Sequence, residues 1–121
     1  MKKLIIGVAS KSFIRQRTID IAAGRIKPKD TDPKIWVNSV ESVGRLLNAE
    51  NLAMIDAIRT QHPATISDLA KLIKREQSNV SRTLKRMAEF HIVDFEETHG
   101  KKMPVVNWDE ISIIPMLSTA A

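Results

Sequence analysis

The chain has 121 residues, a net charge of +5 and no cysteine. This length suffices for one small domain with an appendage. The lack of cysteine excludes disulfide scaffolds and thiolate metal sites, and it is compatible with a reducing compartment. The N-terminal apolar run is shorter than that of a secretory signal, and no stretch approaches the ~20 apolar residues of a membrane span. We therefore expect a cytoplasmic protein without a membrane partner.

Basic residues are concentrated in two stretches of the sequence. Residues 1–29 hold eight Lys or Arg and one acidic residue, and residues 69–88 hold six and one. The stretches 30–68 and 89–121 are acidic overall. Concentrated positive charge favours a polyanionic partner such as nucleic acid. The alternative for either stretch is a solvated, charged surface.

The N-terminal segment predicts a strand or arm followed by a helix. Residues 1–9 form the short apolar strand or arm. A helix is predicted over residues 12–26, because Ser12 can cap it and apolar residues return at helical spacing. Gly24 and Pro28 end this helix.

A linker is predicted over residues 27–34, which combine two prolines with alternating charges. The short apolar segment 35–37 is expected to dock this linker on the core. We expect residues 1–34 to form an arm for dimerisation or partner binding, because this basic, apolar extension is set apart by the linker.

Two helices are predicted in the middle of the chain, over residues 39–47 and 49–61. The second helix ends at residues 62–63 (His-Pro), since the residue before proline is disfavoured in a helix. Its expected apolar stripe consists of Leu52, Ile55 and Ile58.

Two further helices joined by a short turn are predicted between residues 65 and 90. Thr65, followed three residues later by Asp68, fits a capping box at the start of the first. The second helix is predicted over residues 77–90 and has one narrow apolar face. That face consists of Val80, Leu84 and Met87.

A β-hairpin is predicted next. Residues 92–96 alternate like a strand, residues 98–101 form a turn and residues 103–106 return as a second strand. A further short apolar run covers residues 111–114. The order of elements predicts a winged helix-turn-helix over residues 35–121: a mainly α fold with a small β-hairpin (α+β), preceded by the N-terminal arm.

The helix over residues 77–90 suits the major groove of duplex DNA. That groove admits one helix, which needs a thin apolar stripe and polar side chains near its N-terminal end. Asn and Gln can bond adenine in two places, Arg can bond guanine in the same way, and later cations lie nearer to phosphates. The candidate residues are Gln77, Ser78, Asn79, Ser81, Arg82, Lys85 and Arg86. The alternative is an ordinary amphipathic surface helix with a solvated polar face.

Further contacts with phosphate are expected from the neighbouring elements. Thr65 and Ser67 begin the preceding helix, where hydroxyl and backbone N–H groups can meet a phosphate. His99, Lys101 and Lys102 place charge at the hairpin tip, which can reach the DNA backbone or the adjacent minor groove.

The segments TISDLA (65–70) and SNVSRTLKRM (78–87), with residues 92–93, resemble the core of MarR-type winged-helix transcriptional regulators. The resemblance is best over residues 50–107. It implies a recognition helix at 77–90, and the hairpin as the wing, over residues 94–105.

Residues 36–51 are similar to a narrower group of small prokaryotic winged-helix regulators, some of which look like antitoxins that repress their own operon. The sequence departs from the family pattern at two turns. His91 stands where the family usually has glycine, and the turn at residues 74–76 contains no glycine.

Enzyme chemistry is not expected. Glu96, Glu97 and His99 fall on a strand and a hairpin tip, where successive side chains point to opposite faces and do not converge. The sequence has no glycine-rich phosphate loop and no nucleophile motif. We therefore expect neither a metal nor a cofactor.

The leading hypothesis is a sequence-specific transcriptional repressor that binds double-stranded DNA as a homodimer, because a two-fold dimer contacts two half-sites about one helical turn apart. The alternative is an antitoxin that binds a small toxin protein through an N-terminal or C-terminal segment and autoregulates its operon. Non-specific architectural binding fits less well, because such proteins rarely need a helix rich in Gln, Ser and Asn.

Overall fold

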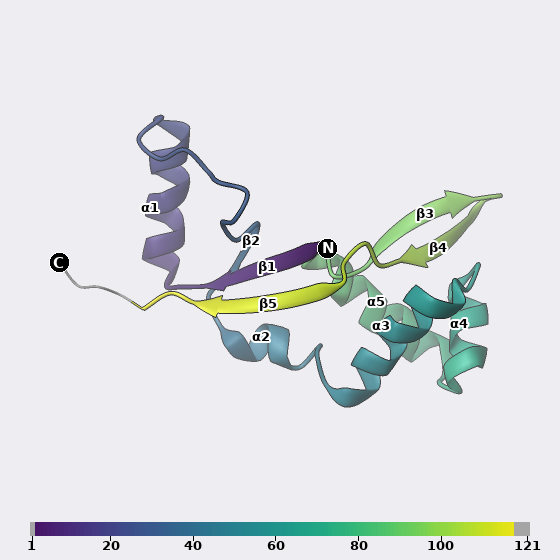
Figure 1. Ribbon diagram of the computed structural model, residues 1–121. Helices are drawn as coiled ribbons and strands as arrows, with labels where there is room; N and C mark the ends of the chain where they lie inside the picture. Colours follow the sequence, from purple (N-terminus) through teal and green to yellow (C-terminus); the bar gives the residue numbers. More distant parts are fainter. Residues whose placement is uncertain (1, 118–121) are drawn as a thin grey trace. The chain divides into compact units, whose positions relative to one another are not determined.

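The computed structural model describes residues 2–117, which divide into two compact units (Figure 1). Unit 1 contains residues 2–43 and 109–117, and unit 2 contains residues 44–108. This division differs from the boundary expected after residue 34. The reason is that two later segments of the chain pair with the N-terminal strand in one sheet.

The sheet of unit 1 consists of β1 (Lys3–Val8), β2 (Ile35–Val37) and β5 (Glu110–Pro115). β1 lies in the centre and pairs in parallel with both neighbours, Ile6 lying opposite Ile35 on one side and Ile113 on the other. Parallel strands need a long crossover, which here contains a helix. The expected arm, anchor and apolar run are therefore three strands of one sheet.

The crossover helix α1 spans Lys11–Ala22. Ser10 caps it rather than the expected Ser12, because the Ser10 hydroxyl accepts a hydrogen bond from the Phe13 N–H at 3.1 Å. Gly24 follows with φ 77°, the left-handed conformation that commonly ends a helix. No side chain of α1 is buried, and Phe13 and Ile19 are 41% and 44% exposed.

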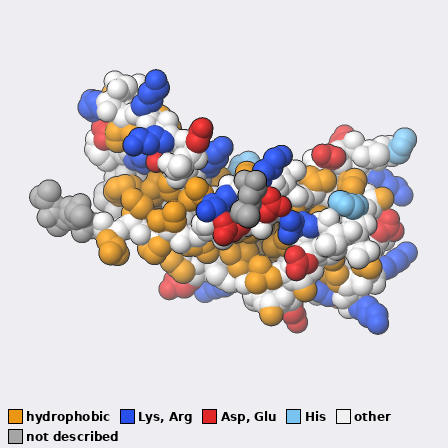
Figure 2. Space-filling view, viewed as in Figure 1, with side chains coloured by type: hydrophobic (Ala, Val, Ile, Leu, Met, Phe, Trp, Pro, Cys, Tyr) orange, Lys and Arg blue, Asp and Glu red, His pale blue; other side chains and the backbone are white. Residues whose placement is uncertain are grey.

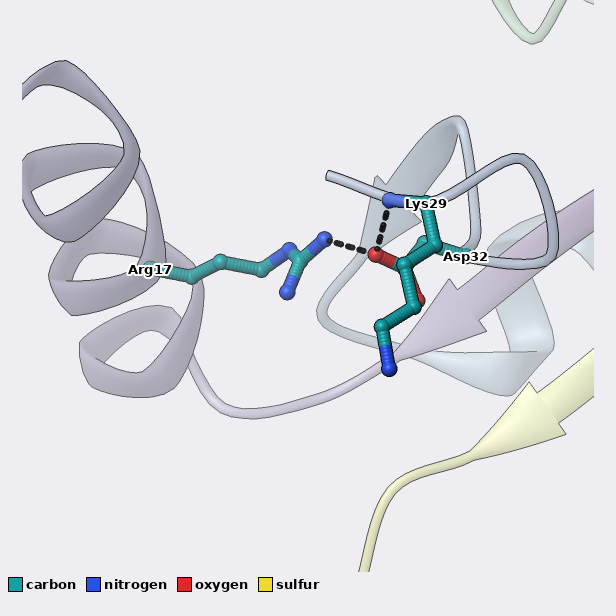
Figure 3. A network of polar contacts seen from close by, with 3 residues as sticks. All are labelled: Arg17, Lys29 and Asp32. Atoms are coloured by element: carbon teal, nitrogen blue, oxygen red, sulfur yellow. Dashed lines mark hydrogen bonds and ion pairs between the residues drawn. The ribbon is translucent and has the colours of Figure 1, made fainter. Parts of the chain in front are cut away.

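The expected linker is held against α1 (Figure 3). One carboxylate oxygen of Asp32 accepts from the Lys29 backbone N–H at 2.9 Å and from the Arg17 guanidinium at 3.1 Å. These two interactions, the backbone hydrogen bond first, hold the pKa of Asp32 below its ordinary value. Residues 27–34 are therefore part of the crossover, not a detached linker.

Trp36 on the edge strand β2 packs against α1 and β1. Its ring centroid lies 5.5 Å from that of Phe13 and 5.3 Å from the guanidinium carbon of Arg17. Gly7 leaves room for this ring, since a Cβ at that position would lie 2.5 Å from a ring carbon. Glycine is thus required by the close approach of the indole to the backbone.

Unit 2 is a winged helix-turn-helix, which confirms the predicted fold (Figure 1). Its elements are α3 (Ala49–Gln61), α4 (Ile66–Ile73), α5 (Gln77–Glu89), β3 (Asp94–Thr98) and β4 (Lys101–Val105). β3 and β4 pair antiparallel as the hairpin, and β4 lies against α3 and α4. The short helix α2 (Val40–Gly44) ends before the expected residue 47 and spans the division between the units.

The core of unit 2 is aliphatic. The stripe of α3 differs from the expected one, because Leu52 is 46% exposed and Met54 is fully buried instead. Buried residues at positions 51, 54, 55 and 58 follow the i, i+3, i+4, i+7 spacing of a helix face. The buried apolar side chains of the later elements are Leu69, Ala70, Val80, Leu84, Met87, Ile92 and Val93.

Non-glycine residues adopt left-handed backbone conformations at the turns of unit 2. Lys74 and His91, at the two turns that lack glycine, have φ of 57° and 56°. The helix boundaries therefore stay within one residue of those expected. His99 (φ 52°) and Gly100 (φ 75°) form the two-residue hairpin turn, and two such residues match the twist of the flanking strands.

Candidate nucleic-acid interface

Helix α5 is held on unit 2 by one narrow stripe. Val80, Leu84 and Met87 are completely buried, as the sequence predicted. At 3.6 residues per turn, the side directly opposite this stripe carries an exposed row of four polar or charged side chains. This crest consists of Ser78, Arg82, Lys85 and Glu89.

The first turns of α4 and α5 are capped differently. The Thr65 hydroxyl accepts from the Asp68 N–H at 3.0 Å, so the N-cap half of the expected capping box is formed. Within the described residues, no side chain caps α5, because the carboxylate of Glu76 accepts instead from the Ser78 hydroxyl at 2.7 Å. The first N–H groups of α5 are therefore left without a side-chain acceptor.

One open hollow joins α4, α5 and the hairpin. It has a volume of about 370 Å³. It contains five of the residues nominated from the sequence, which come from three separate segments of unit 2. Its lining residues are Thr65, Ile66, Ser67, Gln77, Lys101 and Lys102. We call it the wing hollow.

A second hollow lies along the opposite flank of α5. It has a volume of about 230 Å³ and contains three guanidinium groups. Asn79, Arg82 and Arg86 were nominated from the sequence, whereas Arg75 and Thr83, which complete the lining, were not. We call it the arginine hollow.

Arg75 belongs to the turn between α4 and α5 and was missed as a candidate. Its guanidinium donates to the side-chain oxygen of Asn51 at 3.1 Å, and Asn51 is only 5% exposed. The available signal was its place in the basic stretch 69–88, close in sequence to Asn79. The partnership with Asn51 spans 24 positions and leaves no local pattern in the sequence.

The remaining nominated residues line neither hollow. Ser78 and Lys85 are exposed on the crest, and Ser81 is half-buried beside it. His99 is exposed at the hairpin turn, on the left-handed residue described above. Apart from Ser81 and His99, the residues nominated from the sequence therefore occupy the two hollows and the crest between them.

The two lysines of the hairpin differ in their surroundings. Lys102 is paired in register with Glu97 on β3, and its ammonium lies 6.0 Å from the centroid of the Phe95 ring. Lys101 is paired with Thr98, which carries no charge. Of the two lysines, Lys101 therefore has fewer favourable neighbours for its charge within the hairpin.

The described part of the chain offers no grouping of three His, Asp or Glu side chains that could hold a metal. Glu96 and Glu97 are neighbours on β3 and so point to opposite faces. Hydrogen bonds from Arg25 and Gln16 hold the pKa of Asp20 below its ordinary value, and Asp20, like Asp32, lies in unit 1. Among residues 2–117, no helix has the length and apolar character needed to span a membrane.

The chain resembles several solved structures. The crystal structure of NolR from Sinorhizobium fredii matches with a TM-score of 0.50 and 16% identity, over 84% of this chain and 81% of that one. The crystal structure of a predicted DNA-binding transcriptional regulator from E. coli has a TM-score of 0.49 and 10% identity, over 83% and 86%. At such identity, the likeness to NolR concerns the fold alone.

No curated protein sequence matches the chain. A protein family does: the sequence profile of HVO_A0114 matches residues 46–113, which is more than half of the chain and includes every element of unit 2. The chain belongs to the HVO_A0114 family.

Proposed function

We propose that the protein is a sequence-specific transcriptional regulator that binds double-stranded DNA in the cytoplasm. The observation that carries this proposal is the surface of α5, whose polar crest lies between two hollows lined by cationic side chains. A helix that enters the major groove has a phosphate backbone on each side of it. Cations on both flanks suit that environment.

The proposed contacts divide by position on α5. Arg82 lies on the crest, where a guanidinium can bond both acceptors of a guanine edge. Gln77 and Asn79, in the first turn, can bond adenine in the same two-point manner. Lys85 and Arg86 lie a turn later and are assigned to phosphates.

The phosphate contacts of the other elements are proposed at the wing hollow. Ser67 contributes a hydroxyl, and Lys101 and Lys102 contribute charge. The Thr65 hydroxyl already accepts the cap hydrogen bond, and its proton can still be donated to a phosphate oxygen. His99 places its imidazole at the tip of the wing.

An amphipathic helix that is merely solvated explains the charge of this surface less well. Within residues 2–117, neither hollow has an Asp or Glu in its lining. Collecting like charges without counter-charges is unfavourable in the free protein, and a polyanion offsets that repulsion.

Selection of bound sites from a random duplex library tests the proposal. We expect one enriched motif, and the selected duplex should bind about 10³-fold or more tightly than a scrambled duplex at the same salt concentration. Equal affinity for both duplexes would contradict sequence-specific regulation.

We further propose that the regulator is a homodimeric repressor, joined through unit 1. The exposed Phe13 and Ile19 of α1 support an interface there, as do the hydrophobic side chains over β1 and β5 in Figure 2. Light scattering at micromolar concentration should give twice the chain mass. Transcription from a promoter that contains the selected site should fall when the protein is added.

The same apolar surface favours a second candidate function, that of an antitoxin. Here unit 1 binds a small toxin protein, and DNA binding serves autoregulation. This candidate predicts a small toxin-like reading frame beside the gene and a stable complex of the two purified products. A dimer that does not bind the neighbouring gene product would eliminate it.

A further inference from the structure

The arginine hollow has a composition that calls for an anion. Arg75, Arg82 and Arg86 line one space of about 230 Å³ together with the amide of Asn79 and the hydroxyl of Thr83. Across residues 2–117, no carboxylate forms an ion pair with any of these three arginines. A bound anion would offset their mutual repulsion.

Arg75 is placed in this hollow from both its backbone and its side chain. Its N–H donates to the carbonyl of Ala70 at 3.0 Å, which closes the end of α4. Its guanidinium donates one hydrogen bond to the buried Asn51, at 3.1 Å. A guanidinium has five N–H donors, so four remain for a ligand while Asn51 holds the group in place.

The two arginines of α5, Arg82 and Arg86, lie on different sides of the helix and are expected to contact different groups. Arg82 lies two residues from Val80 and Leu84, and therefore on the side of the helix opposite the buried stripe. Arg86 follows Asn79 by seven residues and lies with it on the flank. The flank arginine and Arg75 can thus share one ligand at the edge of the helix, while Arg82 remains directed to the groove.

We propose that the arginine hollow is a phosphate site, in which Arg75, positioned by Asn51, and Arg86 bind one phosphate group. Planar guanidinium groups match the oxygens of phosphate in a two-point manner. The phosphate belongs either to the DNA backbone, in which case this site rests on the proposed function, or to a free phosphate compound. Asn51 acts as a positioning residue.

The test combines two measurements on the intact protein. Affinity for selected and random duplexes is titrated at several salt concentrations for the parent, Arg75→Gln and Arg86→Gln. Each variant should lose about tenfold in affinity on both duplexes. The slope of log affinity against log salt should become shallower by about 1, with the preferred sequence unchanged.

Arg45→Gln is the matched control, because it removes the same charge from an exposed residue outside both hollows. Thermal unfolding verifies that the variants fold. Arg86 is exposed, so its variant keeps the test valid if the loss of Arg75 destabilises the turn. The second measurement follows the side-chain resonances of Arg75 and Arg86 by NMR during titration with inorganic phosphate.

The outcomes separate the two sources. Loss of duplex affinity beyond the Arg45→Gln control assigns the site to the DNA backbone. Arginine resonances that shift with inorganic phosphate, with duplex binding at the control level, assign it to a free phosphate compound. If the arginine resonances shift with inorganic phosphate but the protein binds no duplex, the phosphate site is supported and the proposed DNA-binding function is contradicted. Control-level duplex binding without shifts would overturn the phosphate site while leaving sequence-specific binding intact.

Discussion

The two units of this chain differ in how far apart in the sequence their partners lie. Unit 2 is one continuous segment, and its helices and hairpin follow one another through short turns. Unit 1 brings together two strands from the first third of the chain and one from near the end of the described residues, with Leu4 beside Ile111. Local sequence patterns therefore suffice to predict a unit in which residues that are close in the sequence are also close in space.

The two units also differ in how their helices α5 and α1 are buried. Unit 2 buries a well-defined stripe on α5 and exposes polar groups, whereas no side chain of α1 in unit 1 is buried. In the proposed function, unit 2 binds the DNA and unit 1 joins a protein partner. The following predictions test that division of labour, from the largest expected effect to the smallest.

Leu84→Asp should unfold unit 2. Leu84 is completely buried, and an unpaired carboxylate there loses the packing of the leucine and the hydration of the charge. We expect a loss of about 4 kcal/mol or more in the free energy of unfolding, measured by circular dichroism during denaturation. Lys85→Asp, on the exposed crest, is the control. Melting of Leu84→Asp at the parent temperature would mean that another face of α5 is buried.

Gly7→Ala should lower the free energy of unfolding of unit 1, by less than Leu84→Asp lowers that of unit 2. The added Cβ would lie 2.5 Å from the Trp36 ring, so the indole or the strand must shift, which costs about 1–3 kcal/mol. Fluorescence of Trp36 in a Trp108→Phe background follows the change. Gly44→Ala meets nothing within 4 Å and serves as the control. Equal stability of the two glycine variants would contradict the packing of Trp36 on β1.

Arg82→Ala should weaken binding to the selected duplex by ~1–3 kcal/mol and relax the preference at one base pair. The reason is its position on the crest of α5, where it can reach a guanine edge. Titrations with the selected duplex and its single-base variants measure this. An equal loss on random duplex would instead place Arg82 on a phosphate, with Arg75 and Arg86.

Lys101→Ala combined with Lys102→Ala should lower affinity on selected and random duplexes alike. Lysine contacts with phosphate release counterions, so the salt slope should become shallower by ~1–2 units, with the preferred sequence unchanged. Lys101→Ala alone should account for most of the change, because the ammonium of Lys102 already lies 6.0 Å from the centroid of the Phe95 ring. An unchanged slope in the double variant would remove the wing from the interface.

The smallest effect expected is the pH dependence of unit 1. Hydrogen bonds from Lys29 and Arg17 lower the pKa of Asp32, so the carboxylate stabilises the fold above its unfolded pKa of about 3.9. That contribution is lost as the pH falls through the lower, folded pKa. Asp32→Asn should therefore flatten the decline in unfolding temperature below about pH 4. The same acid dependence in parent and variant would show that the network contributes nothing.

The sequence by itself determined most of unit 2. The Thr65 cap, the buried stripe at Val80, Leu84 and Met87, and the hairpin turn at Gly100 are local patterns, and each lies where it was predicted. The strand β3 begins two residues after the start of the predicted strand 92–96. Local patterns succeed here because caps, helix periodicity and two-residue turns depend on residues within a few positions of one another.

Only the tertiary structure decided the parallel sheet of unit 1 and the composition of the two hollows. A strand of three residues such as β2 carries no signal for its partner, and parallel pairing depends on which distant segment covers the same apolar face. The placing of Arg75 by Asn51 is likewise a contact across 24 positions. Such contacts form only when the whole unit has folded, because they join residues that local conformation does not bring together: apolar burial selects the strand pairing, and a hydrogen bond holds Arg75 to the buried Asn51.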